Sequence, residues 1–348
     1  MGSNKESRRA IMASESREQG ESLAATATFR RGIYKSERFR RMAQWFNAMP
    51  HPALAIEIST ERVALVRWSR RGALEDLAVE ALRPGVLLPS AVEANIVDLS
   101  ALKSGVESVC KRLHVREGDA ATLLVPDPVI RVFVQHFEDF PRSSAEALPL
   151  LRWRLRKSVP FDLEEMLVSY TRQAPRENGV NVVTALARLP IVREYEELVR
   201  ASKLRPGVVL SSSIAAVALL DDKRPTLMVR IAGKALTTAI VRGGTLCGYR
   251  CTELPAPSSQ LLPRMLLDEI FPVAAYYQDT WQEKVQSVIV SGLGARMRDF
   301  SPLLEEEFHC PVHSLLQSAI KAGRVPEPAQ GLADRELEGL LGWMWYRA

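Results

Sequence analysis

TLMVRIAGKALTTAIVRGGTLCGYR, residues 226–250, contains two apolar runs separated by Gly233 and Lys234. This pattern predicts two strands joined by a tight turn, because glycine allows the backbone conformations that short hairpin loops need. Arg230 lies inside the first run, where a buried strand is normally apolar. Its guanidinium is therefore expected to be either half of a structural ion pair or a contact to an anionic group.

A similar hairpin pattern occurs much earlier in the chain. Residues 53–59 (ALAIEIS) and 62–69 (RVALVRWS) are typical of strands. They are followed by patterns typical of a third strand, a helix and a fourth strand, at residues 74–82, 98–115 and 121–137. The later hairpin is likewise followed by a helix, a strand, a glycine-containing turn and a second helix. The chain thus shows one unit twice, which predicts an α/β protein.

The length and composition are those of a folded protein with more than one domain. The 348 residues are 47% hydrophobic and 25% charged, and a chain of this length suits two domains of ordinary size. The net charge of +5 is concentrated in residues 1–50, which hold ten basic and five acidic residues. Because the remainder has balanced charges, nucleic acid is not expected as a partner. Nucleic-acid binding by the basic tail is the alternative.

Residues 1–50 form a basic N-terminal extension. Residues 1–28 are polar and are predicted to be disordered. Residues 29–49 mix basic and aromatic side chains, so they are either an amphipathic helix that contacts an anionic membrane or a solvated linker. The chain has neither an apolar run of membrane-spanning length nor an N-terminal apolar signal region, which predicts a cytoplasmic protein.

The sequence contains no pattern that predicts catalytic or metal-ligating residues. The four cysteines include no CxxC pair, and the spacing of Cys247 and Cys251 predicts that both side chains lie on one face of a strand. The segment HCPVH at 309–313 lacks a second cluster, so it does not indicate a zinc site. The serines at 211–213 are expected to cap a helix rather than to act as nucleophiles.

Residues 158–170, SVPFDLEEMLVSY, carry the most specific resemblance to a known family. Their PFDLEE segment resembles that of the PilM family, the cytoplasmic actin-like components of type IV pilus assembly within the actin-like ATPase superfamily. Residues 129–148, 288–312 and 337–348 resemble further segments of the family in the same order. The resemblance covers roughly residues 52–348.

The resemblance implies an α/β, actin-like ATPase fold, with two related domains around a cleft and an inserted subdomain of the PilM/FtsA type. It implies a first domain over residues 51–205, with the inserted subdomain at about 128–180, and a second domain over residues 206–348. A second helical subdomain is expected to be shortened, because only ten residues separate the later hairpin from the next helix, at 251–260.

Both hairpins depart from the pattern that binds nucleotide in this family. Where family members have Asp-Ile-Gly, this chain has Glu-Ile-Ser at residues 57–59 and Arg-Ile-Ala at residues 230–232. Arginine contacts phosphate but cannot hold Mg²⁺, which needs oxygen ligands. The resemblance implies that these two positions face each other across the cleft, so Glu57 and Arg230 are predicted to form an ion pair or to approach closely. The resemblance implies a degenerate nucleotide cleft formed by Glu57, Ser59, Thr60, Arg230, Gly233, Lys234, Gly292 and Gly294.

Two hypotheses of function follow from the resemblance. In the first, the protein is a scaffold or adaptor of type IV pilus assembly or a related secretion system, peripheral to the inner membrane, without catalytic residues, metal or ATP hydrolysis. Its partner is the N-terminal cytoplasmic peptide of a PilN-like inner-membrane protein. In the second, it is an ATPase that still binds ATP and Mg²⁺, with Lys234 and Arg230 contacting phosphate. The partner groove of the first hypothesis is formed by Arg131, Phe133, Arg152, Arg154 and Phe161.

Overall fold

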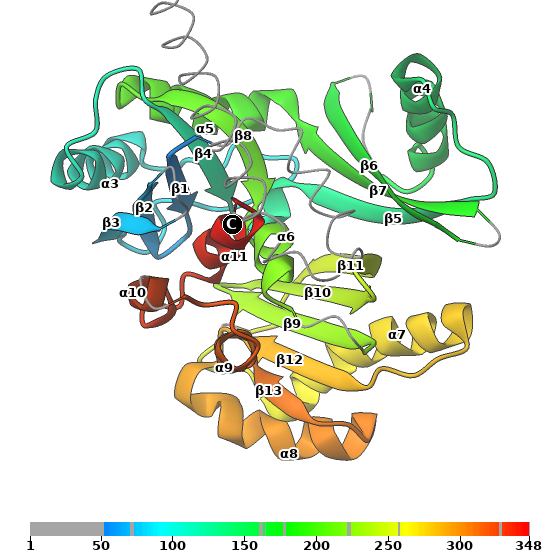
Figure 1. The fold of residues 1–348 in the computed structure, drawn as a ribbon. Helices are drawn as coiled ribbons and strands as arrows, with labels where there is room; N and C mark the ends of the chain where they lie inside the picture. The colour runs from blue at the N-terminus through cyan, green and yellow to red at the C-terminus, as the bar shows by residue number, and fades with distance from the viewer. Residues whose placement is uncertain are drawn as a thin grey trace, which may run out of the picture.

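The computed structural model describes residues 52–69, 73–159, 163, 165–176, 179–220, 224–256, 258–326 and 329–347. The predictions for residues 1–50 and for Phe161 fall outside these ranges. Within them, no helix combines the length and the apolar character that crossing a membrane requires. Figure 1 shows three sheets and the helices that cover them.

The first sheet has five strands in the order β3-β2-β1-β4-β8. β1 pairs antiparallel with β2 and parallel with β4, and all five of its residues are buried. Helices α3 (Leu99–Arg112) and α5 (Leu189–Ala201) pack on this sheet and contact each other. Each helix buries an apolar stripe and exposes charged side chains, which explains its amphipathic sequence. The strands are β1 (Leu54–Ile58), β2 (Arg62–Trp68), β3 (Leu74–Ala81), β4 (Ala120–Val125) and β8 (Arg205–Ser211).

The second sheet repeats this strand order as β11-β10-β9-β12-β13. Helices α7 (Pro263–Trp281) and α8 (Met297–Phe308) pack on one face and enclose a separate apolar core with it. The repeated order confirms the duplicated unit expected from the sequence. The strands are β9 (Thr226–Ala232), β10 (Ala235–Arg242), β11 (Thr245–Glu253), β12 (Ser287–Ser291) and β13 (Val312–Ser314).

Residues 226–250 contain one strand more than predicted. β10 ends before Gly243 and β11 starts after Gly244, and both glycines adopt a positive φ that closes a second tight turn. The prediction of two strands is therefore wrong, because this glycine pair divides the second apolar run.

A three-stranded sheet of order β5-β7-β6 is inserted into the first half of the chain. Its strands are β5 (Arg131–Phe137), β6 (Met166–Arg176) and β7 (Gly179–Arg188), and helix α4 (Ser144–Leu155) covers one face through two small apolar cores. In Figure 1, α4 lies on the outer side of this sheet, away from the second sheet. β7 continues past the subdomain end predicted near residue 180, and the predicted boundary at 205 falls at the start of β8. The division into domains stays a prediction.

The C-terminal helix α11 (Glu338–Arg347) packs between the two five-stranded sheets (Figure 1). It lies against α6 (Ser212–Ala216) so closely that a Cβ atom on Gly342 would be 2.0 Å from the Ala215 carbonyl oxygen. The largest apolar core contains side chains of both sheets and of α11, so it joins the two halves of the molecule. The remaining elements are η1 (Asp127–Val129), η2 (Val217–Leu219), η3 (Gly294–Arg296), α9 (Leu315–Lys321) and α10 (Gln330–Ala333).

Candidate functional site

The two hairpins place Glu57 and Arg230 at equivalent positions. In the first hairpin a two-residue loop follows Ser59, and in the second a two-residue loop follows Ala232. Glu57 on β1 lies two positions before Ser59, and Arg230 on β9 lies two positions before Ala232. β1 and β9 are the central strands of their sheets. The duplicated fold therefore directs these two side chains toward each other.

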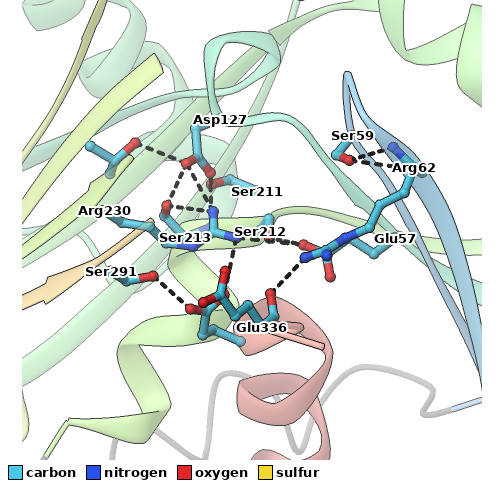
Figure 2. Close-up of polar contacts among 12 residues, drawn as sticks. Glu57, Ser59, Arg62, Asp127, Ser211, Ser212, Ser213, Arg230, Ser291 and Glu336 are labelled. Carbon is cyan, nitrogen blue, oxygen red and sulfur yellow. Dashed lines mark hydrogen bonds and ion pairs between the residues drawn. The ribbon is translucent and has the colours of Figure 1, made fainter. Parts of the chain in front are cut away.

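Arg230 is buried among three carboxylates (Figure 2). Its Nη2 lies 3.6 Å from Glu57 Oε1 and 3.9 Å from Glu338 Oε2, and its Nη1 lies 3.5 Å from Asp127 Oδ2. Each of the four side chains is at most 8% exposed. The predicted ion pair between Glu57 and Arg230 is confirmed, and Arg230 has two further anionic partners that the prediction missed.

Asp127 is fixed by donors from the start of α6 and from β10. Its Oδ1 accepts hydrogen bonds from Ser211 Oγ at 2.5 Å and from Ser213 N at 2.8 Å. Its Oδ2 accepts from Thr237 Oγ1 at 2.9 Å and from Ser213 Oγ. Ser211 also caps α6 by accepting from Ile214 N, as predicted for this run of serines. These four hydrogen bonds hold the Asp127 carboxyl group in a fixed position.

Glu57 and Glu338 each accept a hydrogen bond from one serine. Ser212 Oγ donates to Glu57 Oε1, and Ser291 Oγ donates to Glu338 Oε1 at 2.6 Å. Glu57 Oε2 has no hydrogen-bond partner among the described residues. Burial raises the pKa of Glu57 and outweighs the opposing field of Arg230 and the Ser212 hydrogen bond. Glu57 therefore keeps its proton to a higher pH than an exposed glutamate does.

Arg230 is a permanent buried cation. Burial would lower its pKa, but the fields of Asp127, Glu338 and Glu57 outweigh burial, so the pKa of Arg230 lies above its ordinary value. Its Nη1 also donates to Ser213 Oγ at 3.2 Å. Because the three carboxylates come from η1, β1 and α11, the guanidinium connects both five-stranded sheets with the C-terminal helix.

The tips of the two hairpins touch each other. A Cβ atom on Gly233 would lie 2.9 Å from Thr60 Oγ1. Ser59 Oγ donates to Arg62 O and accepts from Arg62 N at 3.1 Å, so this hydroxyl serves its own turn. Arg62 Nη2 donates to Glu336 O at 2.7 Å and ties the first hairpin to the segment before α11 (Figure 2). Five predicted cleft residues thus gather around this contact: Glu57, Ser59, Thr60, Arg230 and Gly233.

The other three predicted cleft residues make structural contacts or lie in open space. Lys234 Nζ forms an exposed ion pair with Glu253 Oε1 at 3.7 Å. Gly292 has a φ of +86°, and a Cβ atom there would lie 1.9 Å from Ile231 O, so glycine is required where β12 ends against β9. Gly294 has no atom within 4 Å of the position of a Cβ atom. A nucleotide-binding role for these residues stays a prediction.

The predicted partner-groove residues lie on β5 and α4. Arg131 is exposed, and Phe133 is half-buried against the core under α4. Arg152 donates two hydrogen bonds to backbone carbonyls of the segment that leads into β6. The Arg154 guanidinium lies 4.6 Å from the centre of the Phe137 ring. Arg152 and Arg154 thus stabilise their own subdomain, and their role in partner binding stays a prediction.

Cys247 and Cys251 lie on opposite faces of β11, so the prediction of a shared face is wrong. The pairing of β10 with β11 shifts between Ile240 and Val241, and this irregularity reverses the alternation of side chains. Cys247 belongs to the core under α7 and α8, whereas Cys251 lies near Asp127, and burial raises the pKa of Cys251 to about 12. Over the described ranges, His, Cys, Asp and Glu side chains form no group of three placed to hold a metal ion.

Sequence reasoning missed Asp127 and Glu338. Residues 121–137 were expected to be one strand, but β4 and β5 are separate strands with η1 between them. The signal was a carboxylate flanked by Pro126 and Pro128, because proline interrupts a strand. Glu338 begins an otherwise apolar helix, and a buried acid in such a place calls for a cationic partner.

Comparison with solved structures identifies the fold. No family model matches the sequence, and no curated protein matches it significantly. Among solved structures, a chain of the PilM-PilN type IV pilus biogenesis complex superimposes with a TM-score of 0.64 at 17% identity, over 86% of this chain and 99% of that chain. This is the PilM-like, actin-like ATPase fold.

Two further solved structures match this chain less closely. The cytoplasmic domain of EpsL, an inner membrane component of the type II secretion system of Vibrio cholerae, has a TM-score of 0.43 at 13% identity, over 69% of this chain and 82% of that chain. A Bacteroides thetaiotaomicron protein with an actin-like ATPase fold has a TM-score of 0.45 at 11% identity, over 85% of this chain and 97% of that chain.

The actin-like ATPase fold implies ATP with Mg²⁺ between the two hairpins, and the residues present here do not fit the Mg²⁺ ion. A Mg²⁺ ion needs oxygen ligands and bound waters. The carboxylates of Glu57, Asp127 and Glu338 instead surround the guanidinium of Arg230. A second cation among them would meet a fixed positive charge at close range, which is unfavourable in a buried site.

Proposed function

We propose that this PilM-like protein is a non-hydrolysing scaffold or adaptor of type IV pilus assembly or a related secretion system. It binds the N-terminal cytoplasmic peptide of a PilN-like inner-membrane protein. The observation that carries the proposal is the buried cluster of Arg230 with Glu57, Asp127 and Glu338, which supplies a built-in cation between the hairpins. The molecule therefore needs neither metal nor nucleotide to hold its two halves together.

The shared fold supports the choice of partner. The matching chain comes from a complex of PilM with PilN, and 99% of that chain is covered. Extended peptides bind proteins through backbone hydrogen bonds and side-chain pockets, and a small inserted sheet beside a larger one offers such a surface. Arg131 and Arg154 are the exposed cations of the predicted groove.

Nucleotide binding is tested by thermal unfolding and calorimetry with Mg-ATP. A ligand that binds the folded state raises the unfolding midpoint in a saturable way. We expect no saturable rise and no steady release of phosphate. A saturable rise without phosphate release would show a nucleotide-binding scaffold, and steady phosphate release would establish the ATPase hypothesis and overturn the proposal.

Partner binding is tested by calorimetry with a synthetic peptide of the cytoplasmic N-terminus of the PilN-like protein from the same organism. Arg131→Glu is expected to weaken binding at least tenfold, because Arg131 is an exposed cation of the predicted groove. Arg298→Glu, at an exposed cation of α8, is the matched control. Arg152 and Arg154 are avoided, because the hydrogen bonds of Arg152 and the contact of Arg154 with the Phe137 ring support the subdomain itself. Absence of binding by the wild-type chain would overturn the scaffold proposal.

A further inference from the structure

The outer face of α4 carries an exposed tryptophan beside exposed cations. We propose that this face binds the surface of an anionic lipid bilayer, with the Trp153 ring at the level of the headgroups. Trp153 is 72% exposed, although tryptophan side chains are usually well buried. Arg156 and Lys157, directly after the helix, are also exposed. The inference goes beyond the scaffold role and does not depend on which peptide the protein binds.

The exposed side chains lie on one side of the helix. Arg156 and Lys157 follow Trp153 by three and four residues. Leu150 and Pro149 precede it by three and four residues. Pro149 is exposed and Leu150 is half-buried. The exposed acid Glu146 lies one turn before Pro149 and Leu150, so this face has one acid at its start, an apolar middle and a basic end. The apolar middle and the basic end are features that amphipathic helices use at membrane surfaces.

The helix holds this face rigidly. Leu151 and Leu155 are fully buried against the three-stranded sheet. The neighbours of Trp153 are fixed as well, because Arg152 donates to backbone carbonyls and Arg154 lies over the Phe137 ring. Figure 1 shows α4 on the outer side of its sheet. The backbone of this face is therefore already ordered before binding, which lowers the entropy cost.

A lipid surface suits these side chains better than an acidic protein does. Protein-binding tryptophans usually lie in apolar, fully desolvated patches. Within the described part of the chain, Trp153 is the one large apolar side chain of α4 that is exposed, and the exposed charged residues that follow it, Arg154, Arg156 and Lys157, are cations. An indole ring is favoured at the membrane–water interface. Each nearby lysine or arginine adds about 1 kcal/mol of attraction to an anionic leaflet.

The test measures binding of the full chain to vesicles by flotation. Vesicles of phosphatidylcholine are compared with vesicles of equal parts phosphatidylcholine and phosphatidylglycerol. The double variant Arg156→Gln/Lys157→Gln is expected to lower partitioning onto anionic vesicles about 25-fold, at about fivefold for each cation. Trp153→Ser is expected to lower it about tenfold, since a tryptophan anchor is lost.

Matched controls separate this face from general charge effects. Arg298→Gln/Lys321→Gln removes two exposed cations elsewhere and gives the same net charge. Tyr276→Ser removes an aromatic side chain of α7 that is 70% exposed. All variants keep residues 1–50, so the basic extension contributes equally to each, and thermal unfolding verifies that each variant is folded.

The proposal holds if the α4 variants lose vesicle binding and the controls keep it. Equal losses in the α4 variants and the controls would show non-specific attraction and overturn it. Unchanged vesicle binding by the α4 variants would overturn it too. If those variants instead lose binding to polyglutamate while vesicle binding stays, the ligand is an acidic protein and the lipid proposal fails.

Discussion

The two hairpins β1–β2 and β9–β10 have the same place in their sheets and opposite charges at the same position. Glu57 in the first corresponds to Arg230 in the second, each two positions before the residue that starts the loop. A duplicated fold brings equivalent positions face to face. When one of these positions carries an acidic side chain and the other a basic one, the contact between them links the two halves of the molecule.

The first hairpin contributes the weaker half of this link and the second the stronger half. Arg230 has three anionic partners. Glu57 contacts Arg230 and the Ser212 hydroxyl through its Oε1, and its Oε2 has no hydrogen-bond partner among the described residues. Changes in the second hairpin are therefore expected to cost more stability than equivalent changes in the first.

The largest effect is expected from Arg230→Ala. Removing one partner of a buried ion pair leaves uncompensated charge and typically costs about 3–5 kcal/mol. Three carboxylates are left here, so the free energy of unfolding, measured with urea at neutral pH, should fall by at least this amount. Arg264→Ala, at an exposed arginine of α7 paired with Asp268, is the control and should change it by about 1 kcal/mol or less. A loss below 1 kcal/mol for Arg230→Ala would contradict the central role of the guanidinium.

A smaller effect is expected from Gly339→Ala, which tests the packing of α11 against the first hairpin. A Cβ atom there would lie 2.3 Å from Ser212 Oγ and 2.8 Å from Glu57 Oε1. Overpacking of this kind costs about 1–3 kcal/mol. Gly331→Ala in α10, where the nearest atom is 3.6 Å away at the end of a flexible arginine, is the control and should be neutral or stabilising. Equal results for the two variants, in urea unfolding, would show that α11 does not wedge against the cluster.

The contact between the hairpin tips is expected to contribute less again. Gly233 has a φ of +60°, and Gly243, in the next turn, has a φ of +55° with open space around it. Alanine at either position carries the cost of a left-handed backbone, about 1–2 kcal/mol. Gly233→Ala adds a clash with Thr60 Oγ1, so it should lower the free energy of unfolding more than Gly243→Ala. If the two substitutions cost the same in urea unfolding, the tips are not in firm contact.

The sequence was sufficient for the parts of the molecule that depend on local pattern. The hairpins and the amphipathic helices follow from apolar periodicity, whereas the pairing of Glu57 with Arg230 was predicted from the resemblance to the PilM family. The third strand after Gly243 and the shift between Ile240 and Val241 were missed, because both depend on how one strand pairs with the next.

The remaining members of the cluster depend on contacts between distant segments. Asp127 and Glu338 are separated by most of the chain and meet at Arg230 because η1 and α11 converge on β9. A single sequence contains no local signal for such a meeting. A buried acid that begins an apolar helix is the kind of feature that predicts an unknown cationic partner without identifying it.

The smallest effect is the pH dependence that Glu57 contributes, and it tests the weaker half of the link. Because burial raises the pKa of Glu57, its folded form binds a proton more tightly than its unfolded form, whose pKa is near the ordinary 4.5. Its contribution to stability is complete below that value and is lost as the pH rises through the folded pKa. Each unit of the rise is equivalent to about 1.4 kcal/mol.

Glu57→Gln removes this titration and keeps the shape of the side chain. The free energy of unfolding of the variant, relative to the wild type, should therefore increase as the pH is raised from about 4.5 through neutrality, in a series of urea titrations. Glu253→Gln, at an exposed surface pair with Lys234, is the control and should show no such trend. A relative stability that falls with rising pH would mean that Arg230 holds Glu57 ionised in the folded state, and that the first hairpin contributes a full charge to the link.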